Sequence, residues 1–507
     1  MPELTPEPGS DAEVSAYAVL QARLPLLFRQ VFADPLAPRT VVVVPGLSMD
    51  CEVLAKVSGC QHYEERQLSM LTLLHLPNTR VVFVSSVAID PAIVDYYLRL
   101  LSGVSEADAR RRLVMLSTGD GSARSLTQKL LERPRLLARI RAAIGDPQTA
   151  HLSVFNSTAL ERSLAVQLGI PLYGCDPRLL DWGGKSGSRR VFREAGIDLP
   201  DGVEDLRDVA GLAAALAALK ARHPSLARAV VKLNQGFSGE GNAVFSYAGC
   251  PDEHTERWIT AHLPLNLAIE ARDLAWERYA AKLTEQGGIV EEWISDEGLR
   301  SPSVQMRITP LGDLETISTH DQILGGPSGQ IFQACTFPAD AAYAVEVQGL
   351  AARVGGVLKS KGVLGRFGVD FVSVPKDGGW RHRAIEINLR KGGTTHTFQM
   401  LQFLTQGCYD AGRAQFLTPA SAARSYYATD NVVNPAYRRL TPQDLFEIAE
   451  QRRLRWDAAS QTGVTFGLVG AIAEFGKLGM VAIDADTAAA RRRFRAAVAV
   501  LDEEAAA

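Results

Sequence analysis

The sequence contains few of the features that mark secreted, membrane-spanning or nucleic-acid-binding proteins. Six cysteines are scattered over 507 residues without a C-x-x-C pair, so we expect reduced thiols instead of a disulfide framework. No apolar run reaches the ~18 residues that suggest a membrane-spanning helix. A net charge of -3 and an aromatic share of 7% leave no basic footprint, which argues against a nucleic acid partner.

The opening segment lacks the marks of a secretory signal. Residues 1 to 13, MPELTPEPGSDAE, are acidic and contain prolines, with no basic region and no apolar core. Together with the reduced thiols, this predicts a cytoplasmic protein that does not use a membrane as partner. The sequence is 46% hydrophobic and 22% charged, so a chain of this length should bury more than one core and divide into two or three domains.

The most informative segment is HRAIEINLRKGGTTH, residues 382 to 396. It places Glu386 and Asn388 two positions apart in an apolar strand, so both side chains should point to one face, while Ile385, Ile387 and Leu389 should point to the other. Arg390, Lys391 and two glycines follow, and they offer cations and exposed backbone N–H groups for phosphate. In isolation, Glu386 would more often form an ordinary ion pair on a solvated sheet face.

A second strand strengthens the functional interpretation. Residues 365 to 372, GRFGVDFV, contain Asp370, and a turn at residues 377 to 379 joins this strand to the next in a predicted hairpin. Asp370 can therefore lie across from Glu386 and Asn388. Magnesium takes a few protein oxygens and completes its shell with water and substrate phosphates, so these three residues predict a Mg²⁺ and ATP site.

These residues resemble the ATP-grasp superfamily of carboxylate-amine ligases, whose C-terminal strands carry a D-F and then an E-I-N pattern. Segments 181–200, 229–245, 287–295 and 303–318 occur in the order that the resemblance implies, although each has an ordinary structural explanation by itself. The resemblance implies that two lysines contact the phosphates, that a glycine-rich loop closes over them, and that a hinge strand meets adenine. The implied nucleotide-binding residues are Lys185, Lys232, Gly236, Phe237, Ser238, Gly239, Gly241, Glu291, Glu292 and Ile294.

The cation that contacts the transferring phosphate has several candidates. Many ATP-grasp ligases place an arginine two residues before the D-F aspartate, but a glycine stands there in this sequence. Arg366 is the nearest alternative, and Arg307, Arg390 or Lys391 could supply the charge instead. His320 is a candidate general base, although structural histidines are more common.

The remaining pattern predicts an α/β and α+β multidomain fold. Short β-branched runs at 40–46, 80–86, 112–118 and 151–156 alternate with helical stretches, which is typical of a parallel, doubly wound sheet, and a helix is expected near 13–32. This organisation resembles the pheganomycin-type peptide ligases. The predicted parts are an N-terminal helical extension (1–37), a Rossmann-like pre-ATP-grasp domain (38–178), an ATP-grasp unit (179–412) with a smaller lobe (185–292) and a magnesium-binding sheet (300–400), and a small α+β C-terminal cap domain (425–507).

The resemblance also implies a reaction. A carboxylate, expected to be that of an amino acid, would be activated by ATP as an acylphosphate and joined to the amine of a peptide, with release of ADP, in natural product biosynthesis. Related ligases often dimerise, so a homodimer is one expectation. Two alternatives stay open: a small amine or a free amino acid as acceptor, and a catalytically inactive ATP-binding sensor or scaffold.

Overall fold

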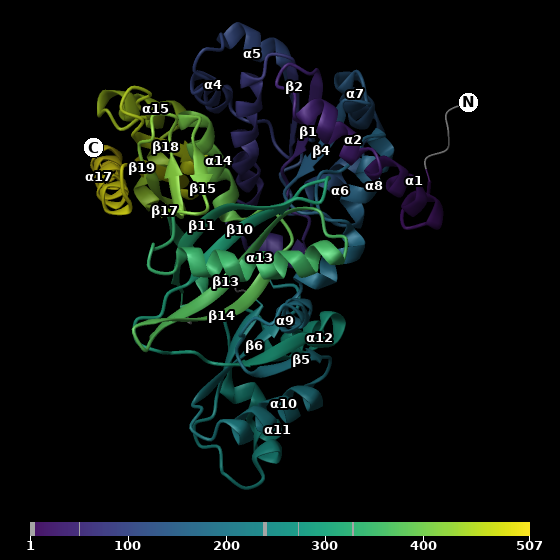
Figure 1. Cartoon of the computed structure of the whole chain (residues 1–507), viewed down its shortest axis with the longest axis vertical. Helices are drawn as coiled ribbons and strands as arrows, with labels where there is room; N and C mark the ends of the chain where they lie inside the picture. Colours follow the sequence, from purple (N-terminus) through teal and green to yellow (C-terminus); the bar gives the residue numbers. More distant parts are fainter. Residues whose placement is uncertain (1–5, 50, 237–240, 272, 327–328, 507) are drawn as a thin grey trace.

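The computed structural model describes residues 6–49, 51–236, 241–271, 273–326 and 329–506. Its strands form a four-stranded, a five-stranded and an eight-stranded sheet, with a separate two-stranded ribbon (Figure 1). The mixture of parallel and antiparallel sheets with helices confirms the predicted α/β and α+β multidomain fold. None of the helices in these ranges is long and apolar enough to cross a membrane.

The N-terminal sheet is parallel, as the β-branched runs predict. Its strands are β1 (Arg39–Val44), β2 (Thr79–Ser85), β3 (Leu113–Ser117) and β4 (Ala150–Val154), and its order is β3-β2-β1-β4. Alternate β1 residues enter different cores: Val41 faces one and Val42 the other, so both faces are covered. The helices around it are α3 (Cys51–Lys56), a 3-10 helix (Cys60–His75), α4 (Pro91–Arg99), α5 (Glu106–Arg112), α6 (Leu126–Leu131), α7 (Pro134–Ile144) and α8 (Ala159–Leu168).

The expected single helix near residues 13–32 is divided. The structure has α1 at Asp11–Gln21, α2 at Leu24–Leu27 and a π-helical turn at Phe28–Phe32. Pro25 lies in the first turn of α2, where its missing N–H does no harm. The same residue would remove a hydrogen bond from a continuous helix, which explains why the helix restarts there.

The five-stranded sheet forms the smaller lobe. Its strands are β5 (Gly202–Leu206), β6 (Arg228–Leu233), β7 (Asn242–Ser246), β8 (Leu267–Ile269) and β9 (Gly288–Glu292). They are antiparallel in the order β5-β9-β6-β7-β8, which places β6 and β9 side by side. The helices of this region are α9 (Lys185–Glu194), which follows a 3-10 helix (Pro177–Gly183), α10 (Val209–Arg222), α11 (Thr255–Asn266) and α12 (Trp276–Gln286).

The eight-stranded sheet includes strands from the predicted magnesium-binding and C-terminal parts. Its strands are β10 (Pro302–Ile308), β11 (Leu314–Gly325), β12 (Ile331–Phe337), β13 (Gly365–Lys376), β14 (Gly379–Asn388), β17 (Ser425–Val433), β18 (Gly463–Gly467) and β19 (Lys477–Asp484). They are antiparallel in the order β14-β13-β10-β11-β12-β17-β19-β18. Because β12 pairs with β17, the segment expected as a separate cap continues the same sheet. The other elements here are α13 (Ala344–Ser360), α14 (Gly393–Thr405), the ribbon strands β15 (Cys408–Asp410) and β16 (Gln415–Leu417), a 3-10 turn (Pro435–Arg439), α15 (Pro442–Gln451), a 3-10 turn (Val469–Ala471), α16 (Ile472–Phe475) and α17 (Thr487–Ala506).

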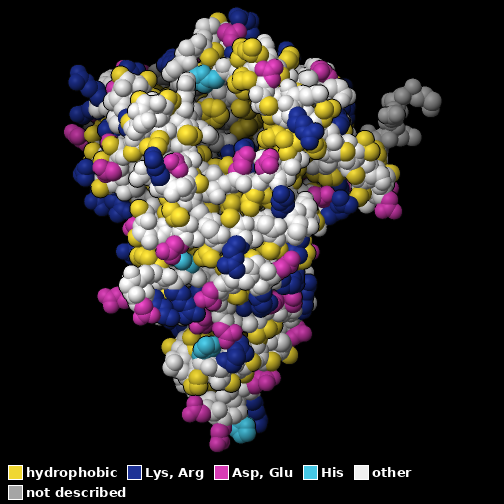
Figure 2. Space-filling model, viewed as in Figure 1, with side chains coloured by type: hydrophobic (Ala, Val, Ile, Leu, Met, Phe, Trp, Pro, Cys, Tyr) yellow, Lys and Arg dark blue, Asp and Glu magenta, His cyan; other side chains and the backbone are white. Residues whose placement is uncertain are grey.

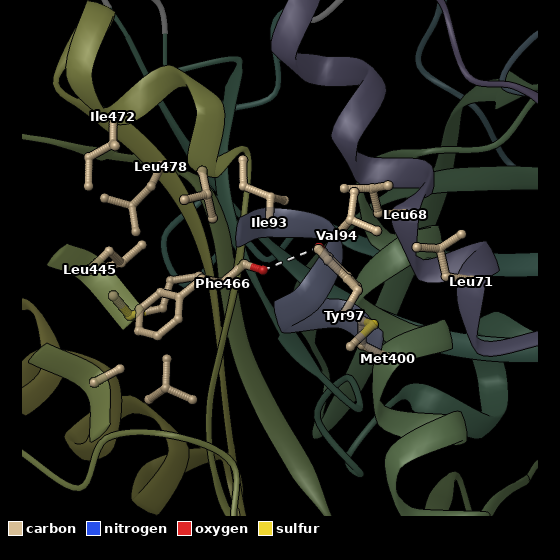
Figure 3. Packing of buried hydrophobic residues seen from close by; sticks show 14 of the residues in the cluster. Leu68, Leu71, Ile93, Val94, Tyr97, Met400, Leu445, Phe466, Ile472 and Leu478 are labelled. Atoms are coloured by element: carbon tan, nitrogen blue, oxygen red, sulfur yellow. Dashed lines mark hydrogen bonds between the residues drawn. The ribbon is translucent and has the colours of Figure 1, made fainter. Parts of the chain in front are cut away.

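One hydrophobic core joins the N-terminal and C-terminal parts of the chain (Figure 3). Leu71 of the 3-10 helix and Tyr97 of α4 belong to the same cluster as Met400 of α14, Phe466 of β18 and Leu478 of β19. The Tyr97 hydroxyl donates a hydrogen bond of 3.2 Å to the backbone carbonyl of Phe466. This core holds the parallel sheet beside strands β18 and β19, at one edge of the eight-stranded sheet.

Phe466→Ala should weaken this joint core. The ring is 2% exposed, so its removal leaves a cavity that costs about 3–5 kcal/mol of unfolding free energy, measured by urea denaturation. Val433→Ala, at a side chain that is 61% exposed, is the control and should change stability by less than about 0.5 kcal/mol. Equal urea midpoints for wild type and Phe466→Ala would contradict this packing.

Candidate active site

A cavity of about 430 Å³, here called cavity 1, lies between the five-stranded and eight-stranded sheets. Strands β6 and β9 contribute Lys232 and Glu291 to its lining, and β13 and β14 contribute Asp370 and Glu386. Lys185, the first residue of α9, also lines it. Residues that are far apart in the sequence therefore meet at one place.

The predicted hairpin places the two carboxylates next to each other. Asp370 of β13 pairs in register with Glu386 of β14, and the Asn388 side-chain amide donates a 3.0 Å hydrogen bond to the Asp370 carboxylate. Lys185 Nζ lies 2.5 Å from Glu386 Oε1. The cluster thus combines two carboxylates and an amide with a cation from the other lobe.

Two local features shape this cluster. The register shifts after Asp370, and Ile385 falls at this bulge and lines cavity 1 instead of pointing away as strict alternation predicts. Position 368, where the resemblance suggested an arginine, is the glycine opposite Asn388. A Cβ atom there would lie 2.8 Å from Gln305 Nε2, so the space is already filled by the Gln305 side chain.

The pKa values of the two carboxylates are shifted in opposite directions. Burial and the neighbouring Glu386 charge raise the pKa of Asp370 to about 6. Burial also acts to raise the pKa of Glu386, but Lys185 and Arg390 outweigh it and hold that pKa below its usual value. Repulsion between two adjacent carboxylates is the situation that a bound cation relieves.

The donor set fits a hard divalent cation better than a soft one. Asp370, Glu386 and Asn388 offer only oxygen ligands, which magnesium prefers, and they leave room for water or phosphate oxygens. Across the described ranges, no group of three or more His, Cys, Asp or Glu side chains is arranged to hold a metal ion. Three protein groups do not complete the octahedral shell of magnesium, so water or substrate oxygens would supply its other ligands.

A buried charge network supports the other wall of cavity 1. The Glu291 carboxylate is 2.6 Å from Lys232 Nζ through one oxygen and 2.6 Å from Arg189 Nη1 through the other. Burial acts to raise the pKa of Glu291, but these two cations keep it below its usual value. Glu291 thus fixes Lys232 beside the cavity, whereas the resemblance suggested a contact with adenine.

The remaining predicted nucleotide-binding residues lie around the same cavity as far as they are described. Glu292 and Ile294 line it, and Glu292 accepts a 3.0 Å hydrogen bond from the backbone N–H of Asp201. Gly236 also lines cavity 1. Gly241 packs closely against it, because a Cβ atom added at position 241 would lie 2.9 Å from the Cα atom of Gly236. Phe237, Ser238 and Gly239 lie outside the described residues.

The four candidate cations are not equivalent. Arg390 lines cavity 1, and its Nη2 donates a 2.7 Å hydrogen bond to Asn388 Oδ1. It also lines a cavity of about 540 Å³ near the glycine loop, cavity 2, and one of about 270 Å³, cavity 3. Arg307, Arg366 and Lys391 line cavity 3 but neither of the other two cavities. Arg390 is therefore the candidate at the junction of all three.

His320 lies in the hydrophobic interior. It has no exposed surface, its Nε2 is 2.7 Å from the Tyr426 hydroxyl, and its ring packs against Phe337. Burial lowers the pKa of His320 to about 3, so its imidazole is neutral. It lines none of the three cavities, which leaves no route from its ring to a substrate there.

Several lining residues were not identified from the sequence. Ser303 pairs in register with Asp370, and Gln305 pairs with Gly368, so alternation along β10 contained a signal for both. Arg66 and Asp430 also line cavity 1 and form a buried ion pair of 2.6 Å, with His396 Nε2 3.3 Å from Asp430. No local pattern connects Arg66 with Asp430, because the fold alone brings them together.

Comparisons with known proteins agree with this arrangement. A model described as IQCH-like, ATP-grasp matches residues 180–250 and 253–412, and a PGM1 C-terminal domain model matches residues 444–497. The chain is 30% identical over 469 residues to L-propargylglycine--L-glutamate ligase of Streptantibioticus cattleyicolor, covering 91% of this chain and 94% of that protein.

Two more distant similarities extend the comparison. IQ motif-containing protein H of Danio rerio is 26% identical over 432 residues, which are 76% of this chain but 40% of that protein. A biotin carboxylase crystal structure from Campylobacter jejuni superposes with a TM-score of 0.52 at 13% identity and covers 90% of each chain. At that identity the superposition is a likeness of fold.

Glu291→Gln should destabilise the smaller lobe. The substitution leaves the buried Arg189 and Lys232 without their shared carboxylate, which should cost about 3–5 kcal/mol in urea unfolding. Glu285→Gln removes a surface pair with Arg278, whose side chains are 58% and 40% exposed, and should leave the unfolding curve unchanged. If both variants unfold like wild type, Glu291 does not hold this network together.

Proposed function

The chain belongs to the ATP-grasp superfamily of carboxylate-amine ligases, and we propose that it activates a carboxylate with ATP in cavity 1 and joins it to an amine. One observation carries the proposal: the carboxylates of Asp370 and Glu386 meet Lys185, Lys232 and Arg390 along a single cavity. Opposed charges of this kind suit a nucleotide triphosphate and its metal ion.

We assign two parts of the lining of cavity 1 to different parts of ATP. Glu292 and Ile294, at the end of β9 and just after it, would meet adenine. Lys185 pairs with Glu386, and the Lys232 charge also lowers the pKa of Glu386, so both cations would neutralise phosphates beside the carboxylates. Asp370, Glu386 and Asn388 would hold Mg²⁺, which supplies charge neutralisation at the phosphate oxygens when bound.

The proposed reaction has two steps. An oxygen of the substrate carboxylate attacks the γ-phosphorus of ATP, and the bond from that phosphorus to the β-phosphate oxygen breaks. ADP departs, and the other product is an acylphosphate. The amine nitrogen then attacks the acyl carbon, phosphate departs, the nitrogen loses a proton, and an amide remains. Arg390, which lies where the three cavities meet, is positioned to hold the transferring phosphate during both steps.

Amino acids are the proposed substrates. The name of the Streptantibioticus relative describes ligation of L-propargylglycine and L-glutamate, both of which are free amino acids. This supports an amino-acid donor, and it favours a free amino acid as acceptor over the amino terminus of a peptide. Both substrates would reach the phosphate through cavities 2 and 3, which share Arg390 with cavity 1.

Glu386→Gln should abolish turnover while leaving nucleotide binding largely intact. The substitution removes a metal ligand but keeps the size of the side chain, so ADP formation should fall at least about 100-fold. The affinity for a non-hydrolysable ATP analogue, measured by calorimetry, should change little. Glu346→Gln on α13, at a side chain that is 60% exposed, is the matched control. Unchanged ligation by Glu386→Gln would falsify the metal assignment.

Arg390→Lys should separate chemistry from binding. Lysine keeps the charge but cannot hold a phosphate with two parallel N–H groups, so kcat should fall about 100-fold while the affinity for the ATP analogue stays constant. Arg381→Lys on the preceding strand β14, at a side chain that is 41% exposed, should behave like wild type. A loss of ATP-analogue affinity with an unchanged kcat would instead assign Arg390 to nucleotide binding.

A further inference from the structure

Cavity 3 lies where the N-terminal sheet meets the eight-stranded sheet. Its walls come from β1 and β4 on one side, from β10 and β13 on the other, and from α14. Figure 2 shows that the surface is hollowed between the N-terminal sheet and α14 on this face. The volume of about 270 Å³ suits part of a small substrate and not a whole nucleotide.

The charge of this cavity is one-sided. Its lining contains Arg39, Arg307, Arg366, Arg390 and Lys391, and no Asp or Glu from the described part of the chain. Carboxylates outside the lining compensate Arg307, Arg390 and Arg39, namely Glu315, Glu386 with Asp370, and Asp34. Arg366 and Lys391 are the two whose charges remain to be compensated, which is costly in a partly enclosed space. The cavity therefore has the electrostatics of an anion-binding site.

Two of these cations have no carboxylate partner among the residues that the structure describes. The Arg366 side chain forms no hydrogen bond or ion pair with any of them, although the Glu315 charge, which is paired with Arg307, also acts on it. Lys391 Nζ is 2.8 Å from Gln67 Oε1 and 2.8 Å from Ser153 Oγ, which are neutral groups. Burial and the nearby Arg366 charge lower the pKa of Lys391 to about 7. An anion bound between Arg366 and Lys391 would remove this repulsion.

The walls distinguish a carboxylate on a carbon skeleton from a bare inorganic anion. Phe32, Met70, Leu73 and Phe403 give the cavity an apolar side opposite its cations. A planar carboxylate matches the guanidinium of Arg366, and methylene groups match the apolar side. Arg390 lines both cavity 3 and cavity 1.

We propose that cavity 3 binds a carboxylate of the substrate that does not take part in the ligation, held by Arg366 and Lys391. This inference rests on the proposed function, because it orients the substrate so that its reacting group lies at Arg390. The substrate class is then an amino acid that carries a carboxylate in addition to its reacting group, whether that reacting group is a carboxylate or an amine. Either a dicarboxylic donor or the free carboxylate of an amino-acid acceptor meets this description.

Calorimetry with L-glutamate, L-glutamine and L-glutamic acid α-amide tests the inference. The full chain is first saturated with Mg²⁺ and a non-hydrolysable ATP analogue, so that binding in cavity 1 is measured separately. Wild type should bind L-glutamate, and one of the two amides should bind at least tenfold more weakly, which identifies the carboxylate held in cavity 3. Arg366→Met and Lys391→Met should each weaken L-glutamate binding at least tenfold and leave the affinity for the ATP analogue unchanged.

Further variants separate recognition from structure. Arg366→Lys keeps a charge and should retain part of the affinity, whereas Arg139→Met, at an exposed position of α7, should change nothing. Without ligand, Arg366→Met should raise the unfolding temperature, because the buried cation that repels Lys391 has been removed. The inference is overturned if wild type binds none of the three probes, or if Arg366→Met binds L-glutamate like wild type. A wild type that fails to bind the ATP analogue would contradict the proposed function instead.

Discussion

The like charges of Asp370 and Glu386, held side by side on β13 and β14, are the constraint on which the rest of the site depends. Their register is fixed by the sheet, so the repulsion cannot be relieved by a shift of one strand. Lys185 compensates it from α9 of the neighbouring region, and Ser188 of the same helix accepts a 3.0 Å hydrogen bond from the backbone N–H of Ile387. Charge compensation at the cluster therefore also joins α9 to the large sheet.

Other charges hold the remaining walls in place. Glu291 fixes Lys232 on the smaller lobe, while the ion pair of Arg66 and Asp430 connects the N-terminal part with β17 across the same cavity. The shared hydrophobic core, which includes Tyr97 and Phe466, keeps these two parts together. Cavity 3 exists because of that joint, since its walls come from both parts. The proposed nucleotide and substrate sites would therefore adjoin at Arg390, which lines both cavities.

Local patterns were sufficient where neighbours in sequence determine the structure. The alternation around Glu386, the turn before it and the β-branched runs of the parallel sheet all predicted the observed strands. Local patterns were insufficient where contacts between distant segments determine the structure. They did not indicate that β17 would pair with β12, that Glu291 would be enclosed by Arg189 and Lys232, or that His320 would be buried. Arg390 lines all three cavities, whereas Arg307 and Arg366 line only cavity 3, and this difference likewise depends on how distant segments pack.

We propose that the paired carboxylates serve ATP-dependent formation of an amide through an acylphosphate. The most direct measurement is product analysis by mass spectrometry after incubation of the full chain with Mg²⁺, ATP, a panel of amino acids and pooled short peptides. The account predicts ADP, phosphate and a new amide whose mass names both substrates. AMP and pyrophosphate beside an amide would instead indicate adenylation of the carboxylate and contradict it.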